Sequence, residues 1–389
     1  MKQSFYYNGT ILTMEGHTPQ YVEAVLVEDG VIQAVGERSV LERDIHGKTR
    51  MINLGGKTML PGFVDAYSGL ARTVYEKAGK RSKGKGLSVP ALLRSVTETA
   101  LWYASFGITT AQEGNCGEKE WQLLRFAGLL GRLPIDVACY FPLDYADGNL
   151  PCHYPMRNAY SFRVRKAGCM LRAEDAGEEQ LLMSLHKDWQ MSIHAESETQ
   201  VDSFLRRYER VLRQYPENHY LRPVLINAKD IRRDQLDKAQ ELGLLISFCV
   251  DQVYYEGDKV YGERAGIERA EHVNPLRMAL RHGLPVTLHQ ATPDAEPNML
   301  FSIHNAVNRV SKGGRILGEQ ERISPYEALR SVTIQAAYQI FEEEHKGSIR
   351  AGKEADFVIL DKNPLKVPPE EIKKIQVLET IKRDKSVGK

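Results

Sequence analysis

The sequence predicts an α/β fold: a (β/α)8 TIM-type barrel with a small β-sandwich formed by the N- and C-terminal segments. Between residues 59 and 341, short apolar runs alternate with amphipathic stretches of helical periodicity, which is typical of parallel strands joined by crossover helices. Eight such runs match the strand number of this barrel, and the length of the region matches its size. Both chain ends are instead rich in strand-forming residues. Residues 1–58 and 342–389 are therefore expected to form one composite β-sandwich domain, and residues 59–341 the barrel domain.

The strands of the composite domain are delimited by turn signals. Asn8-Gly9 and Asp29-Gly30 are dipeptides that favour tight turns between strands. Each separates two runs rich in β-branched and aromatic residues, and the C-terminal end carries similar runs. The expected strands are 5–7, 10–14, 24–28 and 31–35 in the N-terminal segment, and 347–350, 355–360 and 377–381 in the C-terminal segment.

The barrel strands are short apolar runs, each followed by a helix-like stretch. In such a barrel the functional side chains lie at the C-terminal ends of the strands. These ends are therefore where the sequence predicts a site. The eight expected strands are 58–65, 109–112, 135–140, 168–172, 190–194, 223–227, 245–249 and 285–288, and the expected helices include 90–106, 178–188, 198–214, 232–242 and 275–282.

Composition and charge exclude several classes of protein. The 389 residues carry a net charge of +1, which gives no field to attract nucleic acid or an anionic membrane. No apolar run approaches the roughly 20 residues of a membrane span, and the first residues lack a basic region followed by an apolar block. The five cysteines are spaced singly, as in proteins whose thiols stay reduced. A cytoplasmic protein is expected, with neither nucleic acid nor membrane as a partner.

Several stretches of the chain are similar to one enzyme family. The segments Leu-Pro-Gly-Phe-Val-Asp-Ala, Phe-Gly-Ile-Thr-Thr-Ala-Gln-Glu-Gly and Ile-His-Ala, with a long C-terminal tail, resemble the amidohydrolase superfamily, and the tail looks most like the N-substituted formamide deformylase-like branch. The resemblance implies hydrolysis of non-peptide C–N bonds by zinc or another divalent metal. The matching segments are 60–66, 106–114, 193–195 and 346–361, with 364–372 for the branch.

The family's metal ligands are mostly replaced in this chain. By the resemblance, the ligand positions fall in chain order on Tyr67, Gly69, Met170, His194, Asn227 and Ala291. Of these, His194 alone keeps the expected side chain. A catalytic zinc needs about three protein ligands and an open position for water. No cofactor is therefore predicted, and His194 is the metal ligand only if any metal is bound.

Other polar residues are expected at the same strand ends. Residues two apart on a strand face the same way, which places Asp65 with Tyr67 and His289 with position 291. The candidate catalytic residues are His194, His289 and Asp65, and the candidate substrate-binding residues are Tyr67, Arg172, Glu196 and Asn227. A purely structural interpretation stays open for each of them: a hydrogen-bonded histidine, an aspartate that binds loop backbone, a tyrosine that fills space, or an Arg172–Glu196 ion pair.

Three functions follow from these observations. The first is a degenerate, metal-free amidohydrolase, a pseudoenzyme that retains a pocket for a small-molecule ligand. The second is an active C–N hydrolase with a rearranged site around His194 and His289. The third is a non-catalytic scaffold subunit. Formation of a homo-oligomer stays open in each case.

Overall fold

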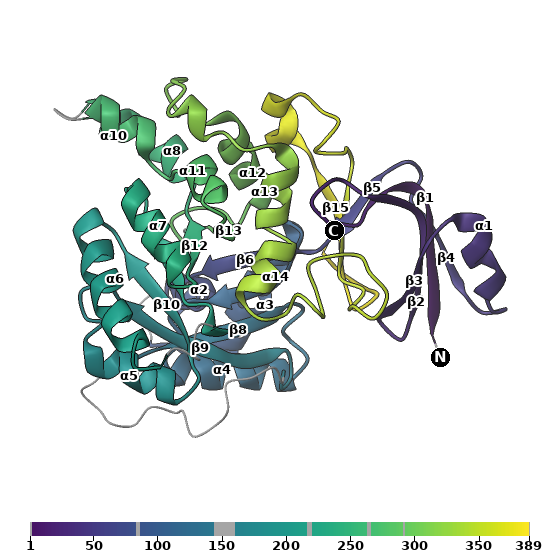
Figure 1. Cartoon of the computed structure of the whole chain (residues 1–389). Helices are drawn as coiled ribbons and strands as arrows, with labels where there is room; N and C mark the ends of the chain where they lie inside the picture. The colour runs from purple at the N-terminus through teal and green to yellow at the C-terminus, as the bar shows by residue number, and fades with distance from the viewer. Residues whose placement is uncertain are drawn as a thin grey trace.

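The computed structural model describes residues 2–82, 86–143, 160–215, 220–262, 266–290 and 292–388 (Figure 1). Its larger part is an eight-stranded parallel sheet in which neighbours in the sheet are neighbours in the chain. The first and last strands come into contact, so the sheet is nearly closed. This confirms the predicted (β/α)8 barrel. The strands are β6 (Phe63–Ser68), β7 (Ile108–Glu113), β8 (Asp136–Pro142), β9 (Val164–Arg172), β10 (Gln190–Ala195), β11 (Val224–Asn227), β12 (Leu245–Phe248) and β13 (Val286–Leu288).

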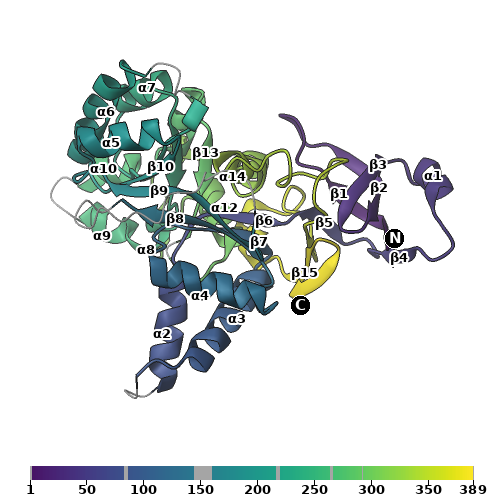
Figure 2. The same ribbon diagram turned by 90° about the horizontal axis from the view of Figure 1, so that it is seen from below.

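Helices surround the barrel, and several begin at the caps that the sequence provides. Ser88 accepts a hydrogen bond from the backbone of Ala91, and Ser197 forms a capping box with Gln200. In Figure 2, the second and third helices project together from one side of the barrel. The helices are α2 (Leu70–Ser82), α3 (Val89–Ser105), α4 (Glu118–Leu129), α5 (Glu178–His186), α6 (Glu198–Leu212), α7 (Arg233–Glu241), α8 (Gln252–Tyr255), α9 (Gly257–Gly262), α10 (Gly266–His272), α11 (Leu276–Arg281), α12 (Met299–Asn308), α13 (Pro325–Ser331) and α14 (Ile334–Gln339).

A second, mixed sheet is built from both ends of the chain, as predicted. Its strand order is β16-β15-β14-β5-β1-β2-β3, with β4 paired to β1. The antiparallel pairing of β14 with β5 joins the C-terminal strands to the N-terminal ones. The elements of the terminal segments are β1 (Gln3–Leu12), β2 (Tyr21–Glu28), β3 (Val31–Gly36), α1 (Arg38–Leu41), η1 (Glu42–Asp44), β4 (Arg50–Asn53), β5 (Thr58–Pro61), β14 (Phe357–Leu360), η4 (Pro369–Lys374), β15 (Val377–Lys382) and β16 (Lys385–Gly388). The short helix η3 (Glu319–Glu321) contacts α11 of the barrel region.

Some expected strand boundaries were wrong. The apolar run 58–65 is divided at Gly62 between β5 of the terminal sheet and β6 of the barrel. A side chain at Gly62 would lie 2.3 Å from Thr109 Cγ2, so the chain crosses between the sheets where only glycine fits. Asn8-Gly9 is an irregularity within the continuous strand β1, and residues 347–350 form no strand. Asp29-Gly30 does join β2 and β3 as a hairpin. The domain boundaries after residues 58 and 341 stay a prediction.

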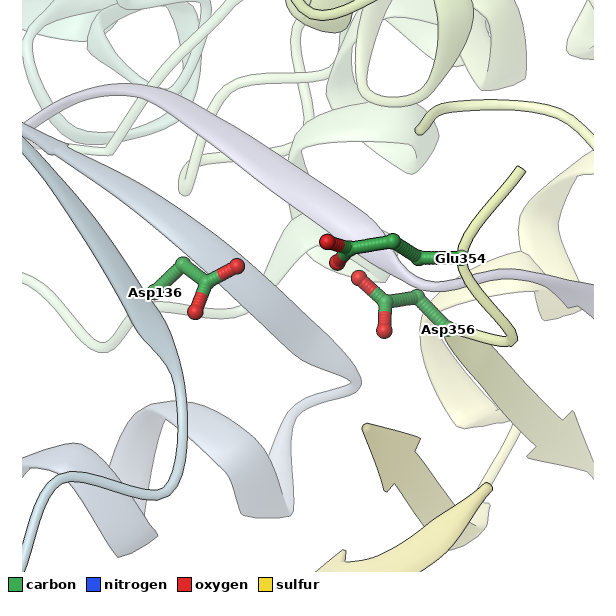
Figure 3. Close-up of side chains that lie close together, drawn as sticks. All are labelled: Asp136, Glu354 and Asp356. Carbon is green, nitrogen blue, oxygen red and sulfur yellow. The ribbon is translucent and has the colours of Figure 1, made fainter. Parts of the chain in front are cut away.

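An ionic cluster joins the base of the barrel to the terminal sheet (Figure 3). Asp136 begins β8, whereas Glu354 and Asp356 precede β14, and their carboxylates converge. The Lys382 ammonium contacts all three: its Nζ lies 2.5 Å from Asp136 Oδ2, 3.1 Å from Glu354 Oε2 and 2.5 Å from Asp356 Oδ2. Lys346 Nζ adds a second contact to Asp136 Oδ2 at 2.6 Å. The carboxylates are therefore occupied by ammonium groups, and the cluster serves as a junction between the two sheets.

Charge keeps this junction ionised. Burial favours the neutral form of Asp136, but Lys346, Lys382 and Arg163 outweigh burial and hold the pKa of Asp136 well below its usual range. Lys382 is fully buried, and the surrounding carboxylates raise its pKa against the effect of burial. In the described part of the chain, no helix is long and apolar enough to cross a membrane.

Candidate functional site

A cavity of about 680 Å³ opens at the C-terminal ends of the barrel strands. We call it the mouth cavity. Its walls come from residues at or just after the ends of six strands, which is where this fold places its functional side chains. The strand-end residues are Tyr67, Ser68, Glu113, Pro142, His194, Asn227 and His289. Residues of the loops and helices that follow the strands include Arg72 and Tyr75 of α2, Glu120 of α4, and Asn115, Glu196, Gln290, Thr292 and Asp294.

Two histidines and an asparagine form a hydrogen-bonded array in this cavity. Asn227 Nδ2 lies 2.8 Å from His194 Nε2, and Asn227 Oδ1 lies 3.1 Å from His289 Nε2. Because the amide nitrogen donates, His194 Nε2 is an unprotonated acceptor, and because the amide oxygen accepts, His289 Nε2 carries a proton. His289 Nδ1 is then free to accept from the Ser247 hydroxyl, 2.8 Å away. Asn227 adopts a left-handed backbone conformation (φ 69°), which asparagine tolerates better than most residues.

The two imidazoles are electrically neutral at pH 7. His289 is 2% exposed, and burial, with a smaller effect of His194, lowers its pKa to about 3. Burial also lowers the pKa of His194, and the opposing attraction of Glu196 does not compensate. Neither histidine is therefore a fixed positive charge in the mouth cavity.

Tyr67 packs against both imidazoles. Its ring centroid lies 6.2 Å from that of His194 and 5.4 Å from that of His289, the latter in an edge-to-face arrangement. A side chain at Gly114 would come within 2.1 Å of the Tyr67 ring, so this position admits only glycine while the ring stays in place. Burial raises the pKa of Tyr67 to about 12, and the phenol stays protonated at neutral pH.

The structure places the other predicted residues in different surroundings. Asp65 is fully buried, its Oδ1 accepts 3.4 Å bonds from the backbone of Tyr67 and Gln290, and its Oδ2 has no hydrogen-bond partner in the part of the chain that the structure describes. Arg172 is exposed, and its Nε lies 3.6 Å from a Glu174 carboxylate oxygen. Glu196 borders the cavity and lies 3.4 Å from His194 Nε2. The structure therefore shows Arg172 and Glu196 with different partners and not the pair considered from the sequence.

Sequence reasoning missed Glu113, which ends β7. Its carboxylate accepts hydrogen bonds from the backbone of Ala71 at 2.8 Å and Asn115 at 3.3 Å, and so holds the first turn of α2. Burial, which outweighs these bonds, raises the pKa of Glu113 to about 8. The only signal in the sequence was a carboxylate at a strand end within the family-like segment 106–114.

The loop after β13 was also missed. Thr292 Oγ1 accepts from the backbone of Gly69 at 3.1 Å and lies 2.5 Å from the Tyr103 hydroxyl. A side chain at Gly69 would lie 2.2 Å from the Thr292 carbonyl oxygen, so this loop occupies the place of any larger residue there. Ala291, the position equated with the family's aspartate, lies outside the described residues.

The described residues at the cavity do not fit a three-ligand metal site. Both Nε2 atoms of the histidines are engaged by Asn227, and Gly69 has no room for an imidazole. A zinc ion needs about three nitrogen, sulfur or oxygen ligands around one point. Within the part of the chain that the structure describes, the only cluster of three such acidic, histidine or cysteine groups is the lysine-filled junction of Asp136.

Replacing Asn227 by aspartate provides a test of the hydrogen-bonded array. We expect Asn227→Asp to raise the pKa of His289 from about 3 by roughly one unit or more, because a carboxylate within hydrogen-bond distance stabilises the imidazolium. The His194 resonances should move in the same direction. Histidine proton NMR recorded against pH measures both values. His282, which pairs with Asp237 away from the cavity, is the internal control, and unchanged His289 resonances would contradict the array.

Comparison with known proteins agrees with this architecture. N-substituted formamide deformylase from Arthrobacter pascens is 30% identical over 192 residues, which is 49% of this chain but 35% of that protein. The chain thus spans about a third of that relative. Imidazolonepropionase from Acinetobacter baumannii is 22% identical over 92% of this chain and 93% of its own length. The crystal structure of an uncharacterised metal-dependent hydrolase from Pyrococcus furiosus superposes with a TM-score of 0.78 at 17% identity, covering 94% of this chain and all of that one.

The family assignment rests on a match over most of the chain. The model of the amidohydrolase family matches residues 67–387, which include every barrel strand from the end of β6 and the C-terminal strands of the second sheet. The resemblance noted in the sequence is thereby confirmed. This chain belongs to the amidohydrolase family.

Proposed function

We propose that this chain is a metal-free amidohydrolase-family protein that binds a small molecule in its mouth cavity and has lost metal-dependent hydrolysis. One observation carries the proposal: the Asn227 amide takes up the Nε2 atoms of both His194 and His289. At His194 Nε2 the lone pair that would bind a metal accepts the hydrogen bond, and at His289 Nε2 a proton occupies that position. Gly69 also supports the proposal, because a side chain at this position would lie 2.2 Å from the Thr292 carbonyl oxygen and no imidazole fits there.

The reaction class of the relatives is the background to this proposal. The name N-substituted formamide deformylase describes hydrolysis at a C–N bond, but the match covers 35% of that protein. Without a metal, a bound water keeps a pKa near about 15.7 instead of about 7 and is a poor nucleophile at neutral pH. The cavity has the position and the size of a ligand site. Without a metal-bound water it has no ready source of hydroxide for hydrolysis.

A second candidate is a C–N hydrolase with a rearranged site around His194 and His289. It is supported by the presence in one cavity of a neutral imidazole, His194, and a carboxyl group, Glu113, whose pKa of about 8 keeps it largely protonated at pH 7. Environments that separate the pKa values of two groups in one cavity are typical of acid–base catalysis. The backbone hydrogen bonds of Glu113 argue for a structural role instead.

Metal analysis separates the two candidates. We expect the chain, purified without chelator, to retain far less than one zinc, manganese or iron ion per molecule, because too few donors converge in the cavity. Calorimetric titration with zinc should show no site removed by His194→Ala. Stoichiometric metal, together with amide hydrolysis abolished in His194→Ala, would contradict the proposal. Hydrolysis without metal, again lost in that variant, would favour the second candidate.

A further inference from the structure

We propose that the ligand of the mouth cavity is a small organic cation that carries N–H donors: an amine, amidine or guanidine in its protonated form. This inference rests on the proposed function, because a bound divalent metal would itself neutralise the carboxylates of the cavity. It names the chemical class of the ligand, which neither the family nor the fold specifies.

The charged side chains of the cavity leave an excess of negative charge. Four carboxyl groups and one guanidinium border it: Glu113, Glu120, Glu196, Asp294 and Arg72. Burial raises the pKa of Glu113 to about 8, so this group is largely neutral at pH 7 and the negative charge lies on the other three carboxylates. The guanidinium is already neutralised, since Arg72 Nε lies 3.3 Å from a Glu76 carboxylate oxygen and Arg72 Nη1 lies 3.2 Å from Asp294 Oδ2. The two histidines add no charge. Concave surfaces lined by one sign of charge concentrate ligands of the opposite sign.

Glu196 is the carboxylate best placed to meet a ligand. It is bordered by Asn227 Nδ2 and His194 Nε2, each 3.4 Å from its Oε1, so these neighbours orient the group only loosely. No lysine or arginine is bonded to Glu196 among the described residues, and its side chain is about half exposed. A ligand cation would supply the strong donor that Glu196 lacks.

An uncharged group in the cavity wall also requires a donor. Gln290 is 1% exposed and lines the cavity, and its Nε2 donates to the Asn298 carbonyl oxygen at 3.0 Å and to the Ser302 hydroxyl. Its Oε1 is buried and has no hydrogen-bond partner among the described residues. A buried acceptor without a partner is costly, and a ligand N–H that reached it would satisfy it. Only a donor can match this acceptor, so a ligand with N–H groups suits this wall of the cavity.

The aromatic lining and the volume of the mouth cavity also suit a small organic cation. Tyr67 and Tyr75 line the cavity, and tyrosine faces attract organic cations through the ring quadrupole. Burial and the nearby carboxylate of Glu120 raise the pKa of Tyr75, so a ring and a carboxylate lie close together here. A volume of about 680 Å³ lies in the range of small-molecule sites. An anionic ligand would find no free cation among the described lining residues.

Three probes of one shape but different charge test the inference. Benzamidinium, benzamide and benzoate share a ring and a planar head group and are positive, neutral and negative at neutral pH. We expect chelator-treated protein to bind benzamidinium roughly tenfold more tightly than either of the others, by isothermal titration calorimetry at low salt. The preference should shrink as salt is added, because part of the attraction is exposed to solvent.

Matched variants locate the binding site. Glu196→Gln removes a cavity charge at constant shape and should weaken benzamidinium binding roughly three- to tenfold without changing benzamide binding. Glu179→Gln removes an exposed charge on α5, outside the cavity lining, and should change neither. Equal affinity for the three probes, no binding of any of them, or equal effects of the two variants would each overturn the inference. The metal content of protein purified without chelator tests the proposed function separately, so the two failures are distinguishable.

Discussion

Replacing Lys382 by methionine is expected to lower the free energy of unfolding by about 3–5 kcal/mol, the largest effect of a single substitution that we predict. The ammonium of Lys382 contacts Asp136, Glu354 and Asp356, and it is fully buried. Methionine keeps a similar chain length but leaves these carboxylates without their shared cation. Removing one partner of a buried ionic cluster costs far more than the cluster contributes overall, because the remaining charges stay desolvated.

The measurement is the urea dependence of far-ultraviolet circular dichroism, compared with that of Lys385→Met. Lys385 lies three residues along, on β16, with an exposed side chain, and its replacement should change stability by less than about 0.5 kcal/mol. Lowering the pH should destabilise the wild-type chain by weakening the same ionic junction. The pKa of Asp136 is depressed, so its contribution is present above its unfolded value and is lost as the pH falls toward the folded one. Equal midpoints for both variants would show that the junction is not a determinant of stability.

Glu113→Gln is expected to remove a loss of stability that the wild-type chain shows as the pH rises from about 4.5 to about 8. Burial raises the pKa of Glu113 from 4.5 to about 8, which corresponds to a difference on the order of 5 kcal/mol between its two protonation states. A carboxyl with a raised folded pKa binds more protons in the folded state than in the unfolded state between these two values. The wild-type chain should therefore lose stability progressively as the pH rises from about 4.5 to about 8.

The glutamine variant has no carboxyl proton to lose, so the order of stability of the variant and the wild type should reverse as the pH rises. Near pH 5 it should be less stable, because an amide cannot accept from both Ala71 N and Asn115 N as the carboxyl oxygens do. Near pH 9 it should be more stable than the wild type. Urea unfolding at several pH values gives the two curves, and Glu179→Gln is the control for loss of one carboxylate. Parallel curves for Glu113→Gln and the wild type would show that Glu113 titrates normally.

The barrel could be predicted from the sequence because its signals are local. Each strand is a short apolar run, and caps such as Ser88 and Ser197 mark where the helices begin. The division at Gly62 could not be predicted, since the runs on both sides are apolar and the reason for the break is the approach of Thr109 from another strand. The course of the chain at Asn8-Gly9 could not be predicted either. The dipeptide permits a turn, but β1 pairs with β2 on both sides of it and continues as one strand.

The candidate site was predictable in its members more than in its arrangement. His194, Asn227 and His289 were expected at strand ends, and they meet in the cavity. Their mutual hydrogen bonds depend on the left-handed backbone at Asn227 and on the register of separate strands, which no local pattern specifies. Glu113 and Thr292 were missed because each accepts from a backbone N–H group far away in the chain, Glu113 from Ala71 and Thr292 from Gly69.

The contact between Gly69 and Thr292 also bears on whether a zinc site could be engineered into this cavity. Histidines at positions 67 and 227 would alter side chains alone, but an imidazole at 69 would place its first carbon 2.2 Å from a main-chain oxygen. Building a metal centre that uses position 69 therefore calls for a redesigned loop after β13 before any ligand is introduced. Side-chain substitutions alone would not make the necessary room, because the obstacle is the polypeptide backbone.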